Sequence, residues 1–301
     1  MITCVILNYN DAKTTIKLVN SIKKLDVLDA IVVVDGASTD GSYNQLIQLT
    51  NKKIHVIKTD KNGGYGYGNN AGIRYSKGLG ADYVAVANPD VTFDTENIRQ
   101  CLSFMKKHTE CVAVSPKIIE THNNAQLAFR IASPLKDVAA ASIILNKLIR
   151  PRYYPTDYFK TGTWKYVDVI PGSFVFFDIN KLCECGLYDE HNFLYSEEFI
   201  IGKKFKEKNY CSAIILTSSY RHEHSVSMRK TFRSPIATKR IVINSQIYYL
   251  KNYCHASKGC LLLLESIRPF VYIEAYIWEL VRSFRAKTFG STNRINIKNS
   301  N

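Results

Sequence analysis

The feature that most constrains the fold is a repeated order of apolar strand, polar turn and helix in the first ninety residues. Short β-branched runs predict strands at 3–7, 30–34, 53–58 and 83–87, and apolar residues at helical spacing predict a helix over 11–25. Uninterrupted apolar runs are typical of strands that are buried on both faces. We therefore predict an α/β fold with an open, mostly parallel sheet flanked by helices.

A polar, turn-forming cluster follows each of these four strands. The clusters are Asn8–Asp11, Asp35–Gly41, a glycine-rich loop at Asn62–Gly72, and Asn88–Asp90. Ligands of open α/β sheets bind beyond the carboxyl ends of the strands. The four clusters therefore predict one shared site.

The net charge is strongly positive, because 40 Lys and Arg stand against 26 Asp and Glu, which gives +14. Nucleic acid, anionic lipid and phosphorylated substrates all suit such a charge, and a solvated lysine-rich surface also produces it. The first residues lack the basic segment of a signal peptide, and charges interrupt the apolar stretch at 260–281. The eight cysteines lack zinc-binding spacing. We expect a cytoplasmic protein with reduced thiols and no membrane-spanning segment.

Candidate ligand-binding groups stand where the predicted strands end. Asp90 and the amide of Asn88 offer oxygens to a hard cation such as Mn²⁺ or Mg²⁺, although Asn-Pro-Asp is also a common turn. Asp35 can accept hydrogen bonds from a nucleobase or cap the following turn. Tyr9, at the neighbouring strand end, offers an aromatic face on which a base can stack.

Further candidates lie in the second half of the chain, where the run 167–177 predicts a strand that Pro171-Gly172 interrupts. Glu197 and Glu198 occupy the first turn of a predicted helix, where the helix dipole alone favours acids and where a carboxylate of raised pKa can act as a general base. His222 and His224 alternate, so both rings face one side of an extended segment and either can bind a metal.

Two other functional classes remain open on the residues alone. Gly66-x-Gly68-x-x-Ala71 loosely fits a dinucleotide-binding pattern, which keeps an NAD(P)-dependent oxidoreductase as one alternative. The positive charge keeps a basic nucleic-acid-binding protein as the other.

Seven motifs in collinear order over about residues 3–227 resemble the inverting family-two glycosyltransferases of the GT-A type, in particular their rhamnosyltransferase-like bacterial branch. They are Asn8-Tyr-Asn10, Val-Val-Val-Asp35-Gly-Ala-Ser-Thr-Asp-Gly41, the stretch Asn62–Gly72, Asn88-Pro-Asp-Val91, Gly172-Ser-Phe, Gly186-Leu-Tyr-Asp189 and Phe193-Leu-Tyr-Ser-Glu-Glu198. The chain departs from the family at Asn88, where an acid is common, and at the Glu-Glu pair, where Glu-Asp is usual. It also has Ile200 and Lys204 where Asp and Arg are frequent, and either His222 or His224 can correspond to the family's late histidine.

The resemblance implies a GT-A catalytic site for a UDP- or dTDP-linked sugar and a divalent cation. The residues that it places at the nucleotide and donor are Asn8, Tyr9, Asn10, Asp35, Ala37, Gly64, Asn69, Asn70, Asn88 and Asp90. Those that it places at the cation are Asp90, Asn88 and His224, and those on the acceptor side are Gly172 and Ser173. Glu198, with Glu197 as the alternative, stands at the position of the catalytic base.

The implied reaction moves a sugar, with rhamnose as one candidate, to a hydroxyl of a polysaccharide or lipid-linked oligosaccharide, with inversion, in bacterial surface polysaccharide synthesis. We expect a catalytic domain at 1–227, with a nucleotide-sugar half at about 1–120 and an acceptor-side half at about 121–227. A basic helical region at 228–290 and a disordered tail at 291–301 would follow. The helical region suits the anionic inner face of the cell membrane, and a helical cap or a homodimer contact accounts for it equally well. Nucleic acid is not expected as a partner.

Overall fold

The protein is described here by a computed structural model, which covers residues 1–120, 127–155, 157–223 and 234–295. The chain divides into two compact units. Unit 1 comprises Met1–Ala132 and Arg152–Met228, and unit 2 comprises Ser133–Pro151 and Arg229–Asn301.

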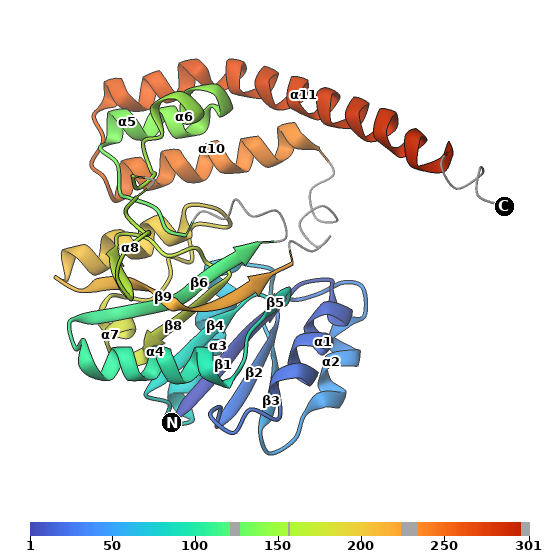
Figure 1. Ribbon diagram of the computed structural model, residues 1–301, viewed down its shortest axis with the longest axis vertical. Coiled ribbons are helices and arrows are strands. Elements are labelled where there is room, and N and C mark those ends of the chain that lie inside the picture. Colours follow the sequence, from blue (N-terminus) through green and yellow to red (C-terminus); the bar gives the residue numbers. More distant parts are fainter. Residues whose placement is uncertain (121–126, 156, 224–233, 296–301) are drawn as a thin grey trace. The chain divides into compact units, whose positions relative to one another are not determined.

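Unit 1 is built on a nine-stranded sheet with the order β3-β2-β1-β4-β8-β6-β9-β5, in which β7 pairs with β9 (Figure 1). The strands are β1 (Ile2–Asn8), β2 (Ala30–Asp35), β3 (Ile54–Lys58), β4 (Tyr83–Ala87), β5 (Val91–Thr92), β6 (Cys111–Glu120), β7 (Trp164–Val167), β8 (Phe174–Asp178) and β9 (Cys211–His222). Strands β1 to β4 pair in parallel, as do β6 and β9, whereas β8 runs antiparallel to β4 and β6. The expected mostly parallel α/β sheet is confirmed.

Helices cover both faces of the sheet, because strands such as β2 are buried at every position and apolar up to the last residue, Asp35. In β2, Ile31 and Val33 belong to an apolar cluster that also contains residues 12–22 and 98–105, whereas Val32 and Val34 belong to a second cluster that contains Ile73 and residues 179–205. The helices of unit 1 are α1 (Ala12–Ile22), α2 (Ser42–Leu46), the short 3₁₀ helix η1 (Ile47–Leu49), α3 (Tyr65–Gly78), α4 (Thr95–Lys107), α7 (Ile179–Glu184) and α8 (Glu197–Glu207).

The strand register places the carboxyl ends of β1, β2, β3 and β4 at one edge, as expected. Asn8 stands opposite Asp35, and Ile6 stands opposite Ala87, the residue before Asn88. The four polar clusters therefore follow neighbouring strand ends. This edge of the sheet is where the predicted site has to be assembled.

Two local predictions are wrong. The stretch Asn62–Gly72, expected as a loop, is mostly helical, because α3 begins at Tyr65. The glycines inside it reflect close packing: a Cβ on Gly68 or Gly72 would overlap Leu7 or Val5 of β1. The run 167–177, expected as one interrupted strand, forms the end of β7 and most of β8, which occupy different places in the sheet.

Unit 2 is helical and consists of α5 (Pro134–Val138), the 3₁₀ helix η2 (Ala139–Ala141), α6 (Ile143–Ile149), α10 (Pro235–Asn252) and α11 (Lys258–Ile295). Residues 133–151, which the sequence assigned to an acceptor-side half, group with the C-terminal helices. Helix α11 continues to Ile295, beyond the expected start of a disordered tail. Within the described ranges, none of the helices is both long and apolar enough to cross a lipid bilayer.

Candidate functional site

The loops that follow β1 and β2 are joined by a buried network around Asp35. The Asn8 amide Nδ2 donates to Asp35 Oδ1 over 3.0 Å, and the other oxygen, Oδ2, accepts from the Ser38 backbone N–H over 3.0 Å. Thr15 completes the network by donating to Asn8 Oδ1 over 2.8 Å. Asn8, Asp35 and Thr15 are fully buried. The Asp35 carboxylate therefore fixes the shape of the loops and has no solvent-facing surface.

The same loops contain two residues in the left-handed backbone region, Asn10 at φ 53° and Ala37 at φ 56°. Asn10 is held because its backbone N–H donates to Ser38 Oγ over 2.9 Å and its Oδ1 accepts from Thr39 N over 2.8 Å. Tyr9 is partly exposed beside them. Of this group, Tyr9 is an aromatic side chain that an incoming ligand can reach.

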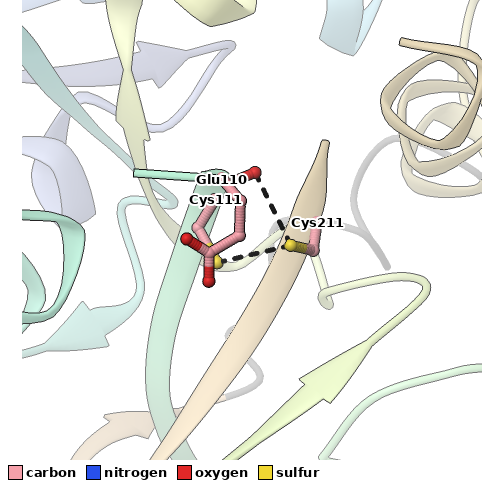
Figure 2. A group of neighbouring side chains, drawn as sticks. All are labelled: Glu110, Cys111 and Cys211. Atoms are coloured by element: carbon pink, nitrogen blue, oxygen red, sulfur yellow. Dashed lines mark hydrogen bonds between the residues drawn. The ribbon is translucent and has the colours of Figure 1, made fainter. Parts of the chain in front are cut away.

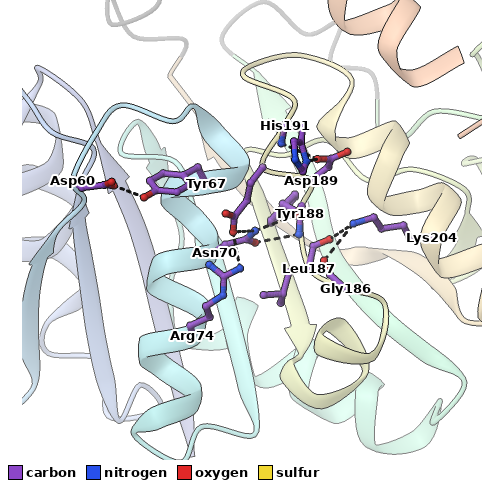
Figure 3. Close-up of polar contacts among 11 residues, drawn as sticks. Asp60, Tyr67, Asn70, Arg74, Gly186, Leu187, Tyr188, Asp189, His191 and Lys204 are labelled. Atoms are coloured by element: carbon purple, nitrogen blue, oxygen red, sulfur yellow. Dashed lines mark hydrogen bonds and ion pairs between the residues drawn. The ribbon is translucent and has the colours of Figure 1, made fainter. Parts of the chain in front are cut away.

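Asn70 of α3 uses its side chain to hold the segment that follows α7 (Figure 3). Its Nδ2 donates to the Tyr188 carbonyl oxygen and to Glu190 Oε1, both over 2.9 Å, and its Oδ1 accepts from Tyr188 N over 3.1 Å. Arg74, one turn later, forms an ion pair of 2.6 Å with Glu190. Asn70 is fully buried, so its contacts are with the protein itself.

Asn69 differs from Asn70 in having a buried oxygen that lacks a hydrogen-bond partner among the described residues. Its Nδ2 donates to the Tyr65 carbonyl oxygen over 3.0 Å, and the residue is 1% exposed. Gly64, just before α3, has φ +91°, and a Cβ there would overlap the Phe193 carbonyl oxygen. Tyr65 N donates to that same oxygen over 3.0 Å. The start of α3 thus packs directly on the segment that leads into α8.

The Asn-Pro-Asp turn, residues 88–90, is anchored by the strand that directly follows it. The short strand β5 pairs with the end of β9, which sets Val91 opposite His222. Asp90 Oδ1 lies 3.3 Å from His222 Nε2, and these side chains are 15% and 12% exposed. His224, the predicted cation ligand, lies outside the described residues. His222 was noticed in the sequence beside His224, but only the β5–β9 pairing reveals that it is the neighbour of Asp90.

The Asp90 carboxylate and the His222 ring fit a divalent cation. A carboxylate oxygen and an imidazole nitrogen 3.3 Å apart, with the Asn88 amide two residues from the carboxylate, form a mixed oxygen and nitrogen set. Such a set suits Mn²⁺ better than Mg²⁺, which prefers oxygen ligands.

A separate cluster of potential metal ligands lies at the opposite end of β6 and β9 (Figure 2). Glu110, Cys111 and Cys211 bring their ligand atoms within 4.8 Å of one another, and the two sulfur atoms are 3.8 Å apart. Because β9 begins at Cys211 and ends at His222, this cluster is distinct from the strand-end site.

Glu197 and Glu198, at the start of α8, have different surroundings. Glu198 is partly exposed, and its Oε1 accepts from the Gly172 backbone N–H over 3.3 Å. Glu197 is 6% exposed, and its Oε2 has no hydrogen-bond partner among the described residues. Burial raises the pKa of Glu197 well above its usual range, and the charge of Glu198 adds to this effect. Burial and the neighbouring charge therefore both favour the protonated form of Glu197.

Burial also raises the pKa of Glu198, but three interactions oppose the shift. They are hydrogen bonds from its own backbone N–H and from that of Gly172, and the positive charge of Arg152. The Arg152 guanidinium carbon lies 4.0 Å from the ring centre of Phe199, the residue after Glu198. Sequence patterns gave no sign of Arg152 as part of this site.

Two consecutive residues connect the Asn-Pro-Asp turn with Glu198. The Ser173 carbonyl oxygen accepts from Asn88 N over 2.8 Å, and Gly172 N donates to Glu198. A Cβ on Gly172 would stand 2.8 Å from Glu198 Oε1, so a side chain at this position would displace the Glu198 carboxylate. Tyr65 OH fixes the same peptide by donating to the Gly172 carbonyl oxygen over 2.6 Å. The arrangement joins a carboxylate of raised pKa to a candidate cation site.

The family model described as glycosyl transferase family 2 matches residues 3–178, more than half of the chain. The chain belongs to glycosyl transferase family 2. The match includes all four strand-end clusters and ends with β8, before Glu197 and Glu198.

Two curated proteins are similar to this family 2 chain. The low-salt glycan biosynthesis hexosyltransferase Agl10 of Haloferax volcanii is 28% identical over 210 residues, which cover 69% of this chain and 62% of Agl10. The succinoglycan biosynthesis protein ExoO of Rhizobium meliloti is 28% identical over 102 residues, which cover 34% of this chain and 28% of ExoO. The matches thus span less than two thirds of either relative.

Solved structures show that the family 2 chain has the GT-A fold. GalNAc-T7, solved with UDP, GalNAc and Mn²⁺, has a TM-score of 0.58 at 14% identity over 80% of this chain and 47% of its own. The mannosyltransferase PcManGT of Pyrobaculum calidifontis, solved with GDP-Man and Mn²⁺, has a TM-score of 0.54 at 13% identity over 99% and 81%. TarS of S. aureus, solved with UDP, has a TM-score of 0.51 at 14% identity over 83% and 72%.

Proposed function

We propose that the protein is a glycosyltransferase of glycan synthesis that transfers a sugar from a nucleoside diphosphate to an acceptor hydroxyl with inversion. Family membership supports the reaction class, and the names of Agl10 and ExoO support a role in glycan or polysaccharide synthesis. The observation that carries the proposal is the pair of contacts at Gly172 and Ser173, which tie Glu198 to the Asn-Pro-Asp turn.

Glu198 is the proposed general base. It is the partly exposed member of the acidic pair, so an acceptor hydroxyl can reach it, and its raised pKa makes its carboxylate a stronger base. Its carboxylate would accept the proton as the acceptor oxygen attacks the anomeric carbon from the side opposite the diphosphate. Glu197, which is buried and has a raised pKa, would support the position of α8 without touching the acceptor.

Asp90 and His222, with Asn88 beside them, are the proposed ligands of a divalent cation, and His224 is a further candidate. When bound, the cation would neutralise charge on the diphosphate of the donor. GalNAc-T7 and PcManGT were solved with Mn²⁺, which agrees with the mixed oxygen and nitrogen set found here.

Tyr9 is the proposed stacking surface for the nucleobase, because it is the partly exposed aromatic residue at the end of β1. Asn8, Asp35, Asn10 and Ala37 would act by holding the two loops in shape. Asn69 offers the donor a buried amide oxygen near Gly64, whereas Asn70 would keep the 186–190 segment in place.

The finer assignments belong to the same proposal. The donor nucleotide would be UDP or dTDP and the sugar rhamnose, with Gly172 and Ser173 lining the acceptor side. The acceptor would be a polysaccharide or lipid-linked oligosaccharide, and the protein would work in the cytoplasm. TarS and GalNAc-T7 were solved with UDP and PcManGT with GDP-Man, so the nucleobase that this chain prefers has to be measured.

The test is thermal unfolding with UDP, dTDP, GDP and NADH, each with and without Mn²⁺. A ligand present at 100 times its Kd stabilises the folded state by about 2.7 kcal/mol, which is easily measured. We expect a shift with one nucleoside diphosphate that requires Mn²⁺ and is lost in Asp90→Asn. A shift with NADH alone would contradict the proposal and favour an oxidoreductase.

A further inference from the structure

Helix α11 is apolar on two opposite faces, which is unusual for a helix at a protein surface. Its inner face packs within unit 2, where Cys260, Leu264, Val271 and Ala275 are buried. The buried Glu274 also lies on this side and binds α6: its carboxylate accepts from Ser142 Oγ over 2.8 Å and from Ile143 N over 2.9 Å. The inner face is therefore fully used by contacts inside the unit.

The outer face consists of large apolar side chains that are 41–67% exposed. They are Leu262, Leu263, Phe270, Ile273, Tyr276, Ile277, Leu280 and Val281. Their spacing of three, four and seven residues places them on one side of the helix. They extend over nearly twenty residues, or about 30 Å along the axis.

No charged residue falls within this outer face. The charged residues between 259 and 281 are Glu265, Arg268, Glu274 and Glu279. At 100° per residue, all four lie on the flanks or the inner side of the helix. A continuous exposed apolar surface of this size marks a site of interaction.

The distribution of charge identifies the partner. Unit 2 contains 16 of the 40 Lys and Arg residues of the chain but only 4 of its 26 Asp and Glu residues, so it carries +12 of the net charge of +14. Unit 1 is nearly neutral at +2. A second copy of the chain docked on α11 would bring two strongly positive units together, whereas an anionic lipid surface would be attracted.

We propose that the outer face of α11 lies in the interfacial layer of an anionic lipid bilayer, with the helix axis parallel to the membrane plane. The apolar stripe would enter the boundary between headgroups and acyl chains, while basic residues of the unit contact the headgroups. Glu265, Arg268 and Glu279 on its flanks suit a helix that lies on the bilayer, and none of the described helices meets the requirements for crossing one.

The experiment is co-sedimentation of the whole 301-residue chain with phosphatidylcholine vesicles, with and without about one third phosphatidylglycerol. We expect binding to the anionic vesicles that weakens as salt rises. The variant Ile273→Glu/Ile277→Glu adds two charges at positions that are 57% and 53% exposed, so folding should be kept, and binding should fall at least tenfold. Circular dichroism checks the helix content of each variant.

The matched control is Tyr75→Glu, which places the same charge at an apolar position of unit 1 that is 37% exposed. Tyr75→Glu should bind vesicles as tightly as the parent chain does. The single variant Ile273→Glu should bind them more weakly than the parent chain. Equal binding by the double variant, or no binding by the parent chain, would overturn the proposal. So would a dimer in light scattering that disappears in the double variant. Lipid binding is measured without donor or acceptor, so its failure leaves the proposed sugar transfer untouched.

Discussion

At the level of single residues, the two acids at the start of α8 lead to different predictions, one for activity and one for stability. Glu198→Gln keeps the size of the side chain but removes its ability to accept a proton, so transfer should fall by roughly 10²- to 10⁴-fold. Donor binding should persist, because Glu198 contacts Gly172 on the proposed acceptor side, whereas the proposed donor residues follow β1, β2 and β4. Initial rates and donor-induced thermal shifts on the same samples make the comparison. Near-normal turnover would exclude Glu198 as the base.

The raised pKa of Glu197 predicts a specific dependence of stability on pH. Because burial raises this pKa in the folded state, the folded chain binds the proton more tightly than the unfolded chain. The stabilisation is complete below the unfolded pKa of about 4.3 and is lost as the pH rises through the folded value. Glu197→Gln is neutral at every pH and should remove this loss.

Urea unfolding between pH 4.5 and pH 8 measures the effect of Glu197→Gln. Glu207→Gln serves as the control, because Glu207 is an exposed residue at the other end of the same helix. If the free energy of unfolding of Glu197→Gln followed the parent curve at all pH values, the burial of a protonated Glu197 would be wrong.

At the level of elements, the contact of α3 with the segment before α8 rests on one glycine. An alanine at Gly64 would meet the Phe193 carbonyl oxygen and would have to adopt a left-handed backbone, so the loss should exceed about 2 kcal/mol. Gly78→Ala, in the same helix with open space around it, should instead stabilise by about 0.5–1 kcal/mol. Chemical unfolding of both variants tests the pair, and equal effects would disprove the steric explanation.

The sequence predicts the secondary-structure elements better than it predicts the contacts between them. Strands β1 to β4 were foreseen because buried parallel strands are continuous apolar runs, and their common edge follows from topology. The sequence left open whether His222 or His224 lies beside Asp90, because His222 reaches Asp90 through the pairing of β5 with β9, whose paired residues are about 130 positions apart in the chain. For the same reason Asp35 and Asn70 were recognised as polar groups at the site, while their buried hydrogen bonds to Asn8 and Tyr188 were not.

At the level of the whole molecule, two units of different character share one chain. Unit 1 contains the sheet and the candidate site, and unit 2 contains most of the net positive charge. Residues 133–151 belong to unit 2 although unit 1 surrounds them in the sequence. Glu274 explains why, because its carboxylate binds the start of α6 to α11 through Ser142, Ile143 and Ile144. The fold of unit 2 thus depends on a buried acid from a distant helix.

Glu274→Ala should therefore destabilise unit 2 selectively. The variant leaves the buried donors at the start of α6 without an acceptor, at a cost of about 2–4 kcal/mol. Hydrogen exchange should become faster in residues 133–151 and in α11, while the amides of β1 and β2 keep their protection. Glu265→Ala, which removes an exposed acid paired with Arg268, is the control and should change little. Faster exchange in β1 and β2 as well would mean that both units unfold together. The prediction that Glu274→Ala destabilises unit 2 selectively would then be wrong.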